Sequence, residues 1–309
     1  MRNTLAILLS VSLGLIFIIS AITKMIPMEP FEYQFVDIGV ATWKTAPYIA
    51  RIFIGIEFFI GFLLILNIAL KKFTLKVSIA FLVFLTGYLI YKIIIDGNAG
   101  SCGCFGEALP MSPLEGIIKN IVLIACCIVC YFAIEKEFWS TKAKKVMTPL
   151  LFITAMCLGF FVYPIDIVFT STLDTSKVNY KVPLELMYQE TQKEKPSINL
   201  LKGKHIIAFL SLSCPHCKIA AKKLHVIHKK NPTLPIYIAL NGDIEKKEPF
   251  LENTQIADIP HNLFLGPKDW ISVAGINLPI IMYVQDGIVI KKFNGSQIEQ
   301  ADMEKWMQQ

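Results

Sequence analysis

Charged residues are scarce in this chain. They make up 17% of its 309 residues, whereas hydrophobic residues make up 54%. A soluble globular protein is normally about a quarter charged. The scarcity of charge therefore excludes a single soluble domain and predicts a protein that is embedded in a lipid bilayer over much of its length.

Long runs without charge account for this composition. Each is near the ~20 residues that an α-helix needs to cross a bilayer. After the first run, which follows Arg2, no small-residue cleavage pattern appears. That run is therefore predicted to be an uncleaved anchor and not a signal peptide. The sequence predicts five transmembrane helices, at residues 5–23, 48–70, 77–95, 116–134 and 148–165.

Lysine and arginine are absent from the loop at residues 96–115, whereas lysines cluster at residues 71–76 and 136–145. Because lysine-rich loops remain in the cytoplasm, the N-terminus is predicted to be cytoplasmic. The loops 27–47 and 96–115, and the part of the chain after the fifth helix, are then predicted to lie outside. In a bacterium this places the protein in the inner (plasma) membrane with its C-terminal domain on the periplasmic side.

Arginine-rich and aromatic-interleaved runs are also missing. The net charge of +6 is explained by the membrane topology and by a lysine-rich soluble surface. Binding of nucleic acid is therefore not expected.

The C-terminal part holds one pair of cysteines, Cys214 and Cys217, separated by Pro215 and His216. An apolar run at 206–210 precedes the pair and a helix-like run follows it. The N–H groups and partial positive charge of a helix N-terminus favour Cys214 as a thiolate nucleophile. Cys217, one turn later on the same face, can attack a mixed disulfide and release the partner. Pro215 suits the first helical position, and His216 can stabilise the thiolate.

Two other readings of this pair are a stapling disulfide and half of a zinc site. A zinc site needs two further ligands at suitable spacing. The soluble part has no other cysteine, and its histidines show no metal-like pattern. Redox chemistry is therefore favoured, and no metal is expected.

Residues 206–309 resemble a thioredoxin-fold domain. The Cys-Pro-His-Cys motif is similar to that of DsbA-like periplasmic oxidants. Asn277-Leu278-Pro279 stands where the family has a cis-proline loop facing the dithiol, so the resemblance implies that Pro279 is cis and helps to hold a substrate strand. Two departures leave the proton acceptor unassigned: Ser213 replaces a common tryptophan, and Ala208 replaces a common buried acid.

A second pair, Cys102 and Cys104, lies among glycines in the loop at 96–115. Such a loop can bring both sulfurs together in a small strained ring. Strained, exposed disulfides are the labile ones. The topology derived from the lysines puts this pair on the same side as Cys214 and Cys217. The alternative is a static staple, although so short a ring restrains almost no chain.

Residues 1–134 resemble the methylamine utilisation protein MauE and the wider DoxX-like membrane family. The resemblance is carried by residues 19–24 (Ile-Ser-Ala-Ile-Thr-Lys), 50–57 and 102–106 (Cys-Gly-Cys-Phe-Gly). It implies a four-helix membrane domain concerned with thiol chemistry or with maturation of exported proteins. The arrangement is also similar to vitamin K epoxide reductase relatives, and this resemblance makes a quinone the candidate cofactor.

Glu57 lies about 13 Å along the second predicted helix from Tyr48. A carboxyl group at that depth must be paired, protonated or next to a polar cavity. Lys24 and Arg51 are the candidate partners. One interpretation is a proton or quinone site beneath the Cys102/Cys104 loop, and the other is a structural ion pair between the first two helices.

Four more cysteines lie within the fourth and fifth apolar runs. Buried thiols in apolar surroundings are usually inert packing residues. Packing is therefore favoured over an electron relay across the membrane, which remains the alternative. These residues are Cys126, Cys127, Cys130 and Cys157.

The sequence thus predicts an α-helical transmembrane bundle followed by an α/β thioredoxin-like domain. The predicted boundaries are 1–134 for the four-helix domain, 135–165 for a cytoplasmic loop and the fifth helix, 166–199 for a connector, and 200–309 for the thioredoxin-like domain.

The predicted function is a membrane-tethered thiol–disulfide oxidoreductase that acts on exported cysteine-containing proteins. Electrons pass between Cys214/Cys217 and Cys102/Cys104, and the helix field and His216 favour an oxidant. One alternative is a non-catalytic assembly or maturation factor for an exported protein. The other is a reductive thiol pathway.

Overall fold

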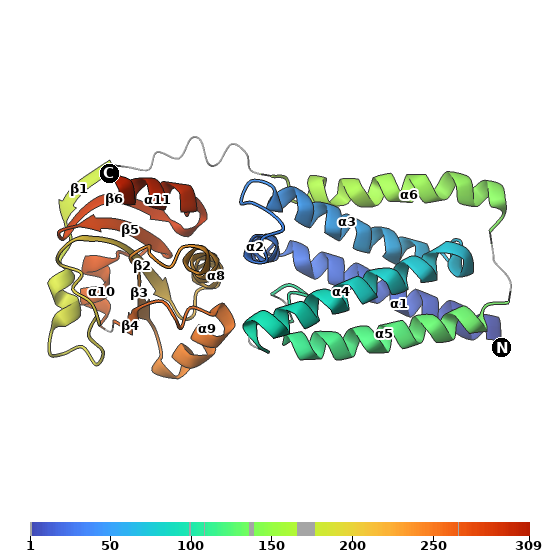
Figure 1. Ribbon diagram of the computed structural model, residues 1–309, viewed down its shortest axis with the longest axis horizontal. Helices are drawn as coiled ribbons and strands as arrows, with labels where there is room; N and C mark the ends of the chain where they lie inside the picture. Colours follow the sequence, from blue (N-terminus) through green and yellow to red (C-terminus); the bar gives the residue numbers. More distant parts are fainter. Residues whose placement is uncertain (1, 99, 108, 136–138, 166–176, 265) are drawn as a thin grey trace. The chain divides into compact units, whose positions relative to one another are not determined.

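The structure is a computed structural model (Figure 1), which describes residues 2–98, 100–107, 109–135, 139–165, 177–264 and 266–309. The chain divides into two compact units, Met1–Ile165 and Asp166–Gln309. The described part of the first unit is helical, and that of the second is built on a six-stranded sheet. The predicted order, a helical membrane bundle followed by an α/β domain, is confirmed.

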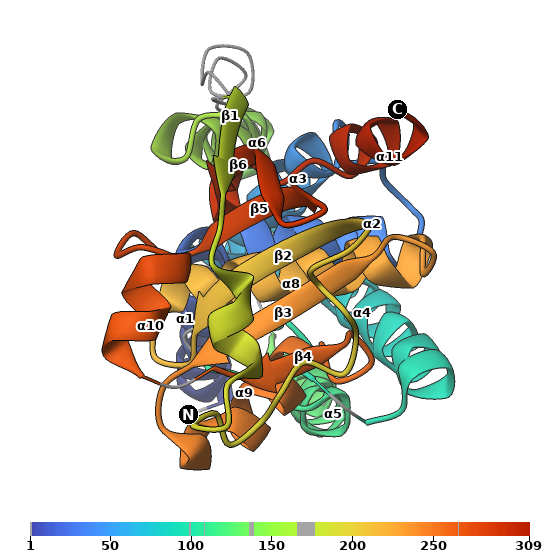
Figure 2. The same cartoon turned by 90° about the vertical axis from the view of Figure 1, so that its left-hand side faces the viewer.

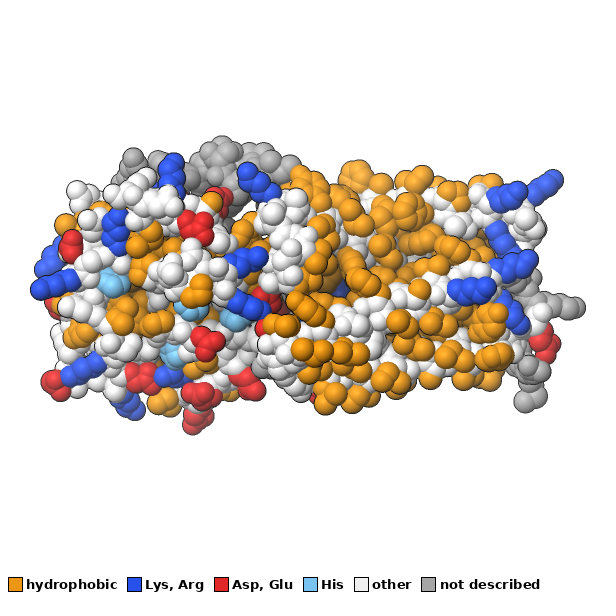
Figure 3. Space-filling model, in the orientation of Figure 1, with side chains coloured by type: hydrophobic (Ala, Val, Ile, Leu, Met, Phe, Trp, Pro, Cys, Tyr) orange, Lys and Arg blue, Asp and Glu red, His pale blue; other side chains and the backbone are white. Residues whose placement is uncertain are grey.

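The helices of the first unit match the predicted apolar runs. Among the described residues, five helices are long and apolar enough to cross a membrane. Apolar side chains cover the face of this unit seen in Figure 3, as expected for a surface that contacts lipid. The elements are α1 (Arg2–Met25), the short α2 (Glu29–Asp37), α3 (Ala46–Ile65), a π-helical turn (Leu70–Thr74), α4 (Leu75–Asp96), α5 (Pro113–Ala133) and α6 (Thr141–Val162).

Helices α1 and α3 pack closely at two glycines. A Cβ atom built on Gly14 would lie 2.8 Å from the carbonyl oxygen of Gly61, and one built on Gly61 would lie 3.1 Å from that of Gly14. Small residues let transmembrane backbones approach in this way. The close approach holds α1 near enough to α3 for Lys24 to contact Glu57 farther along the two helices.

The second unit is organised around a sheet with strand order β1-β6-β5-β2-β3-β4. β2, β3 and β4 are parallel, whereas β5 is antiparallel to β2, and β6 is antiparallel to both β5 and β1. The strands are β1 (Lys177–Lys181), β2 (Lys204–Ser211), β3 (Ile236–Asn241), β4 (His261–Leu263), β5 (Ile280–Gln285) and β6 (Ile288–Asn294).

Helices cover both faces of this sheet. Figure 2 shows η2 and α10 in front of the strands and α8 behind them. Asp286 and Gly287 join β5 to β6 with positive φ angles of 51° and 78°, as a two-residue β-hairpin turn requires. The helical elements are η2 (Leu184–Tyr188), α8 (Pro215–Lys230), η3 (Ile244–Lys246), α9 (Lys247–Thr254), α10 (Pro267–Val273), η4 (Gly295–Gln297) and α11 (Gln300–Gln308).

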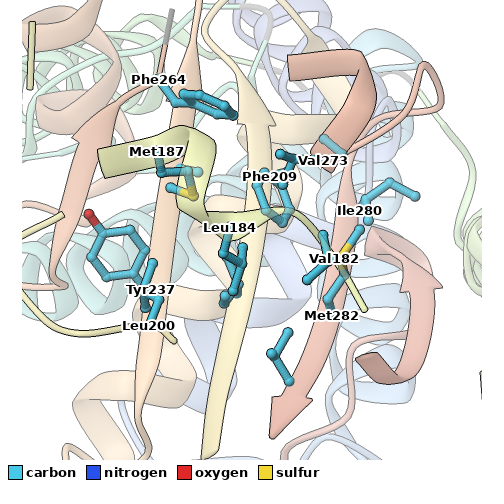
Figure 4. Close-up of a cluster of buried hydrophobic side chains, with 14 of the residues drawn as sticks. Val182, Leu184, Met187, Leu200, Phe209, Tyr237, Phe264, Val273, Ile280 and Met282 are labelled. Carbon is cyan, nitrogen blue, oxygen red and sulfur yellow. The ribbon is translucent and has the colours of Figure 1, made fainter. Parts of the chain in front are cut away.

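The prediction that residues 166–199 form a connector is wrong from Lys177 onward. Strand β1 pairs with β6, which adds it to the sheet. Val182, Leu184 and Met187 are buried in the core on one face of the sheet (Figure 4). The domain therefore begins at Lys177 at the latest and not at residue 200; residues 166–176 lie outside the described residues.

The polar stretch around Glu194 explains the error. Its charges resemble those of a solvated linker, but the Glu194 carboxylate accepts hydrogen bonds from Lys247 Nζ at 2.6 Å and from the Leu263 N–H at 2.8 Å. These bonds fasten the stretch to α9 and to the edge strand β4.

Candidate active site

Cys214 is the N-cap residue of α8, directly after β2. Its Sγ accepts a hydrogen bond from the backbone N–H of Cys217 at 3.4 Å. The Cys214 side chain is half-buried, and Pro215 and His216 are exposed beside it. The sulfur therefore lies at the N-terminus of α8, where backbone N–H groups are free to donate hydrogen bonds.

Cys217 differs from Cys214 in its exposure. It is fully buried, at 0% exposed. Burial raises the pKa of the Cys217 thiol, and its hydrogen bond to Cys214 adds to this effect. An accessible sulfur at the helix start and a buried thiol one turn later suit a nucleophile and a resolving group.

Pro279 and the active-site helix α8 both approach Gly295. The Leu278–Pro279 peptide bond is cis, as the resemblance implied. A Cβ atom built on Gly295 would lie 2.5 Å from Pro279 Cγ and 3.0 Å from Ala220 Cβ. Ala220 follows Cys217 by one helical turn, so the cis-proline loop and the active-site helix are joined through Gly295.

The surroundings of Ala208 are apolar. Ala208 is fully buried in β2, and its partners in the adjacent strands are Ile238 and Ile281. On the other side of the dithiol, Lys246 Nζ donates a hydrogen bond to Ser213 Oγ at 3.4 Å. Lys246 also forms an ion pair with Asp243 at 2.8 Å. The sequence carries no signal for its contact with the residue before Cys214, because η3 is distant in the chain.

The loop between α4 and α5 brings Cys102 and Cys104 together, as predicted. A Cβ atom built on Gly116 of α5 would lie 3.2 Å from Cys102 Sγ and 3.4 Å from Cys104 Sγ. The expectation of an exposed pair is wrong, because the two residues are only 3% and 7% exposed. The loop folds into the bundle, where Ser20 Oγ donates to the Cys104 carbonyl at 2.9 Å.

Two glycines of this loop are required by the packing. Gly103 has a φ of +67°, and a Cβ atom there would lie 1.9 Å from Gln34 Nε2 of α2. Gly106 has a φ of +56°, and a Cβ atom there would lie 2.2 Å from the Thr23 carbonyl oxygen of α1. The short helix α2 and the end of α1 thus form the walls that enclose the loop.

The two loop thiols differ electrostatically. A hydrogen bond from the Cys102 thiol lowers the pKa of Cys104, and the positive charges of Lys119 and Lys24 lower it further. That same hydrogen bond, together with burial, raises the pKa of Cys102. Lys119 lies over the Phe105 ring, 4.6 Å from its centroid. Cys104 is therefore the sulfur at which negative charge is stabilised.

Glu57 is paired with Lys24, one of its two predicted partners. Lys24 Nζ lies 2.8 Å from Glu57 Oε1 and 2.6 Å from Ser20 Oγ. Both residues of the pair are almost fully buried, at 3% and 2% exposed. The other candidate, Arg51, instead pairs with Glu32 at 2.8 Å and donates to the carbonyl oxygen of Tyr163. Ser20 links the pair to the backbone of Cys104.

A cavity of about 40 Å³ lies beneath the Cys102/Cys104 loop. For comparison, a buried cavity that binds benzene has a volume of about 150 Å³. The cavity that these residues form is therefore too small for the ring of a quinone. Polar groups that line it come from Lys24, Glu57, Tyr88, Lys119 and Asn120.

The remaining cysteines lie within the helices of the bundle. Cys127 and Cys130 are fully buried in an apolar cluster with Leu13, Leu64 and Leu123. Cys126 and Cys157 are half-buried. Their surroundings agree with a packing role. Among the residues that the structure describes, no three His, Cys, Asp or Glu side chains are grouped so that they could hold a metal ion.

The class that this fold and this site support is that of membrane-tethered thiol–disulfide oxidoreductases. Residues 2–133 match the family model of the methylamine utilisation protein MauE, as the sequence suggested. The chain is 28% identical over 329 residues to Protein TlpB of Flavobacterium psychrophilum, an alignment that covers 92% of this chain and 89% of TlpB.

Two solved structures show a weaker likeness. One is the thioredoxin domain of a thiol-disulfide oxidoreductase from Bacteroides vulgatus, with 17% identity, a TM-score of 0.30, and coverage of 35% of this chain and 81% of that one. The other is a secreted disulfide oxidoreductase of Mycobacterium tuberculosis, with 15% identity, a TM-score of 0.28, and coverage of 34% and 81%.

Proposed function

We propose that this protein oxidises thiols of exported cysteine-containing proteins at Cys214/Cys217 and passes the electrons to Cys102/Cys104. The observation that carries the first half is the contact of Cys214 Sγ with the N–H of Cys217 at the start of α8. A sulfur in this place is a good leaving group, because the thiolate that it becomes is stabilised by the helix.

The first half of the reaction is a thiol–disulfide exchange. A client thiolate attacks Cys214 of the Cys214–Cys217 disulfide, and the bonding electron pair leaves with Cys217, which takes a proton from water. A second client thiolate then attacks the client sulfur of the mixed disulfide, and Cys214 leaves as a thiolate. The client gains a disulfide, and the protein holds a dithiol.

The second half restores the Cys214–Cys217 disulfide. The Cys214 thiolate attacks Cys102 of the Cys102–Cys104 disulfide, and Cys104 leaves with the electron pair. Cys104 suits this role because its lowered pKa marks it as the better leaving group. Cys217 then attacks Cys214 and releases Cys102. The ring of a quinone does not fit the cavity beneath these thiols, so the proposed path ends at Cys102/Cys104.

The proposed exchange requires Cys214/Cys217 and Cys102/Cys104 to lie on the same side of the membrane. The five helices that are long enough to cross a membrane support a second unit on the side opposite to the N-terminus. Three of these helices precede the Cys102/Cys104 loop, which supports the same side for that loop. Lysine and arginine side chains gather at the end of the helical unit where α1 begins (Figure 3), which favours a cytoplasmic N-terminus. We therefore infer a bacterial inner-membrane protein whose two dithiols face the periplasm.

Alkylation trapping tests this function. The full chain in membranes is incubated with a reduced, unfolded protein that contains several cysteines, and free thiols are then labelled and counted at each pair by mass spectrometry. We expect Cys214/Cys217 to become reduced first and Cys102/Cys104 second. If neither pair changes oxidation state, the protein is a non-catalytic assembly factor.

A further inference from the structure

Asn120 of α5 is a buried polar side chain whose bonding is incomplete. It is 0% exposed, and its Nδ2 donates to Thr86 Oγ1 at 3.2 Å. Its Oδ1 accepts no hydrogen bond from the residues that the structure describes. A buried amide oxygen without a donor destabilises the fold. Asn120 lines the cavity beneath Cys102 and Cys104, so a small O–H donor in that cavity would satisfy it.

The size of the cavity limits which molecule can enter it and donate a hydrogen bond to Asn120. At about 40 Å³ it exceeds the roughly 10–15 Å³ that one water molecule needs, yet it is far below the volume that a six-membered ring needs. Water is therefore the ligand that fits, and the cavity connects three kinds of group: the two thiols, the Asn120 amide, and the Lys24–Glu57 pair.

Charge balance indicates what this water does. Lys24 and Lys119 supply two positive charges that act on Cys104, and Glu57 is the carboxylate that acts on it. Moving a proton from the Cys104 thiol to Glu57 replaces one anion with another and leaves the net charge of this buried group unchanged. Such an exchange avoids the large cost of an uncompensated buried charge.

We propose that Glu57 is the proton acceptor of the Cys102/Cys104 dithiol, and that the proton passes from Cys104 to Glu57 through water held at Asn120. The proposal rests on the proposed function only in requiring that Cys102/Cys104 is redox-active. The proposal assigns a proton acceptor to the membrane unit. The soluble unit has no acid at the corresponding place, because Ala208 stands there.

The S–H bond of Cys104 breaks, an O–H bond forms on Glu57, and the Cys104 thiolate supplies the electron pair of a new bond to a disulfide sulfur. Cys102 then loses its proton to water and attacks the Cys104 sulfur, which closes the Cys102–Cys104 disulfide; the partner disulfide leaves as two thiolates that take protons from water. The proton on Glu57 then returns to water. In the reverse direction Cys104 leaves as a thiolate and Glu57 takes up a proton from water, so the reduced pair holds a Cys104 thiolate beside a neutral Glu57.

The contacts of Lys24 allow Glu57 to become neutral. Lys24 Nζ also donates to Ser20 Oγ at 2.6 Å and lies 5.7 Å from the centre of the Phe31 ring. The ammonium group thus keeps two partners when Glu57 is protonated. The other charged or titratable groups packed around the two thiols are Lys119 of α5, Tyr88 and Lys92 of α4, and Asp37 and Asp96, which act on Tyr88.

The test measures how the reduction potential of Cys102/Cys104 depends on pH. The full chain carries Cys214→Ser and Cys217→Ser, so that the soluble pair does not contribute, and is equilibrated with glutathione redox buffers around neutral pH. Each proton coupled to a two-electron couple shifts the potential by about 30 mV per pH unit. With Glu57 protonated in the reduced state, oxidation releases two protons, one from Cys102 and one from Glu57. We therefore expect the reduction potential to fall by about 60 mV for each unit of pH. Glu57→Gln should halve this slope.

The matched control is Glu32→Gln, which breaks the ion pair with Arg51 outside the cavity lining and should leave the slope unchanged. Equal slopes in Glu57→Gln and the parent chain would overturn the proposal. If Glu57→Gln does not fold, redox-difference infrared spectra of the parent chain decide: a protonated carboxyl band must appear on reduction, and its absence refutes the proposal.

The outcomes also separate this proposal from the proposed function. A Cys102/Cys104 pair that titrates with the expected slopes but does not exchange with Cys214 would refute the electron path and support the proton site. A pair that exchanges with Cys214 but keeps its slope in Glu57→Gln would do the reverse.

Discussion

The two dithiols of this protein are built on opposite principles. Cys214 caps a helix at a surface, next to the exposed Pro215 and His216. Cys102 and Cys104 are both buried, in a loop enclosed by α1, α2 and α5. In the first pair the half-buried Cys214 is open to attack by a client sulfur, whereas both sulfurs of the second pair must be uncovered before any protein sulfur reaches them.

The two pairs also stabilise a thiolate by different means. Backbone N–H groups and the helix dipole act on Cys214, whereas the side-chain charges of Lys119 and Lys24 act on Cys104. Backbone dipoles are fixed by the fold, but side-chain charges change with protonation and substitution. The difference suggests that the soluble pair is built to meet varied clients and the membrane pair to be controlled by its surroundings.

The largest effects are expected from substitutions in the Cys214/Cys217 pair. Cys214→Ser should abolish exchange with clients, because it removes the sulfur at the helix N-terminus. Cys217→Ser should instead accumulate mixed disulfides with client proteins, because the resolving thiol is lost. Non-reducing gels distinguish the two results. Wild-type activity in Cys214→Ser would show that this assignment is wrong.

The next largest effect is expected from a substitution that disturbs only the packing around the Cys102/Cys104 loop. Gly106→Ala places a Cβ atom 2.2 Å from the Thr23 carbonyl oxygen at a φ of +56°, and the backbone conformation alone costs about 1–2 kcal/mol. We expect the oxidation of Cys214/Cys217 by the membrane pair to fall by at least about tenfold. Client oxidation by pre-oxidised Cys214/Cys217 should be unchanged.

Gly87→Ala in α4 is the matched control, because a Cβ atom there would meet nothing within 4 Å. If Gly106→Ala and Gly87→Ala reoxidise the soluble pair equally fast, the enclosed loop does not determine the activity of the membrane pair.

A smaller effect sharpens the electrostatic difference. Lys119→Met removes a positive charge that lowers the pKa of Cys104, so the pKa should rise and the thiolate fraction at neutral pH should fall. The pH profile of Cys104 alkylation should move to higher pH, with a rate about threefold to tenfold lower at neutral pH. The control is Lys71→Met, since Lys71 lies over the ring of Tyr131 and not over that of Phe105. A profile unchanged by Lys119→Met would contradict the proposed role of this charge.

The smallest effect concerns the soluble pair. His216→Gly removes an exposed group that can stabilise the Cys214 thiolate, and stabilising the reduced form raises the reduction potential. We expect the potential of Cys214/Cys217 to fall by on the order of 30 mV, measured against glutathione buffers. A wild-type potential near about −270 mV, the range of cytosolic reductants, would favour the reductive pathway instead.

Features with a strong local signal could be predicted from the sequence. Helix α8 begins where the sequence predicted a helix, because Cys214 and Pro215 mark its start. The five long helices follow from apolar runs, and the position of Pro279 implied its cis bond. Each depends on neighbouring residues or on a family motif.

Features that depend on distant parts of the chain could not be predicted. Strand β1 is short and is held by β6, more than a hundred residues later, so it resembled a linker. The burial of Cys102 and Cys104 depends on Gln34 and Thr23, which carry no signal for such a contact. Asn120 did carry a signal, because a polar side chain within an apolar run usually has a function.

The central claim is that the two dithiols form one electron path, and a trapped cross-link tests it most directly. The full chain with Cys217→Ser and Cys104→Ser keeps Cys214 and Cys102, the two sulfurs that should bond when Cys104 is the leaving group. Mass spectrometry of the oxidised membrane fraction should then find a Cys102–Cys214 disulfide, in greater yield than Cys104–Cys214 in the matched variant with Cys217→Ser and Cys102→Ser. If neither linkage forms while both pairs are redox-active in the unmutated chain, another protein reoxidises Cys214/Cys217 and the claim is wrong.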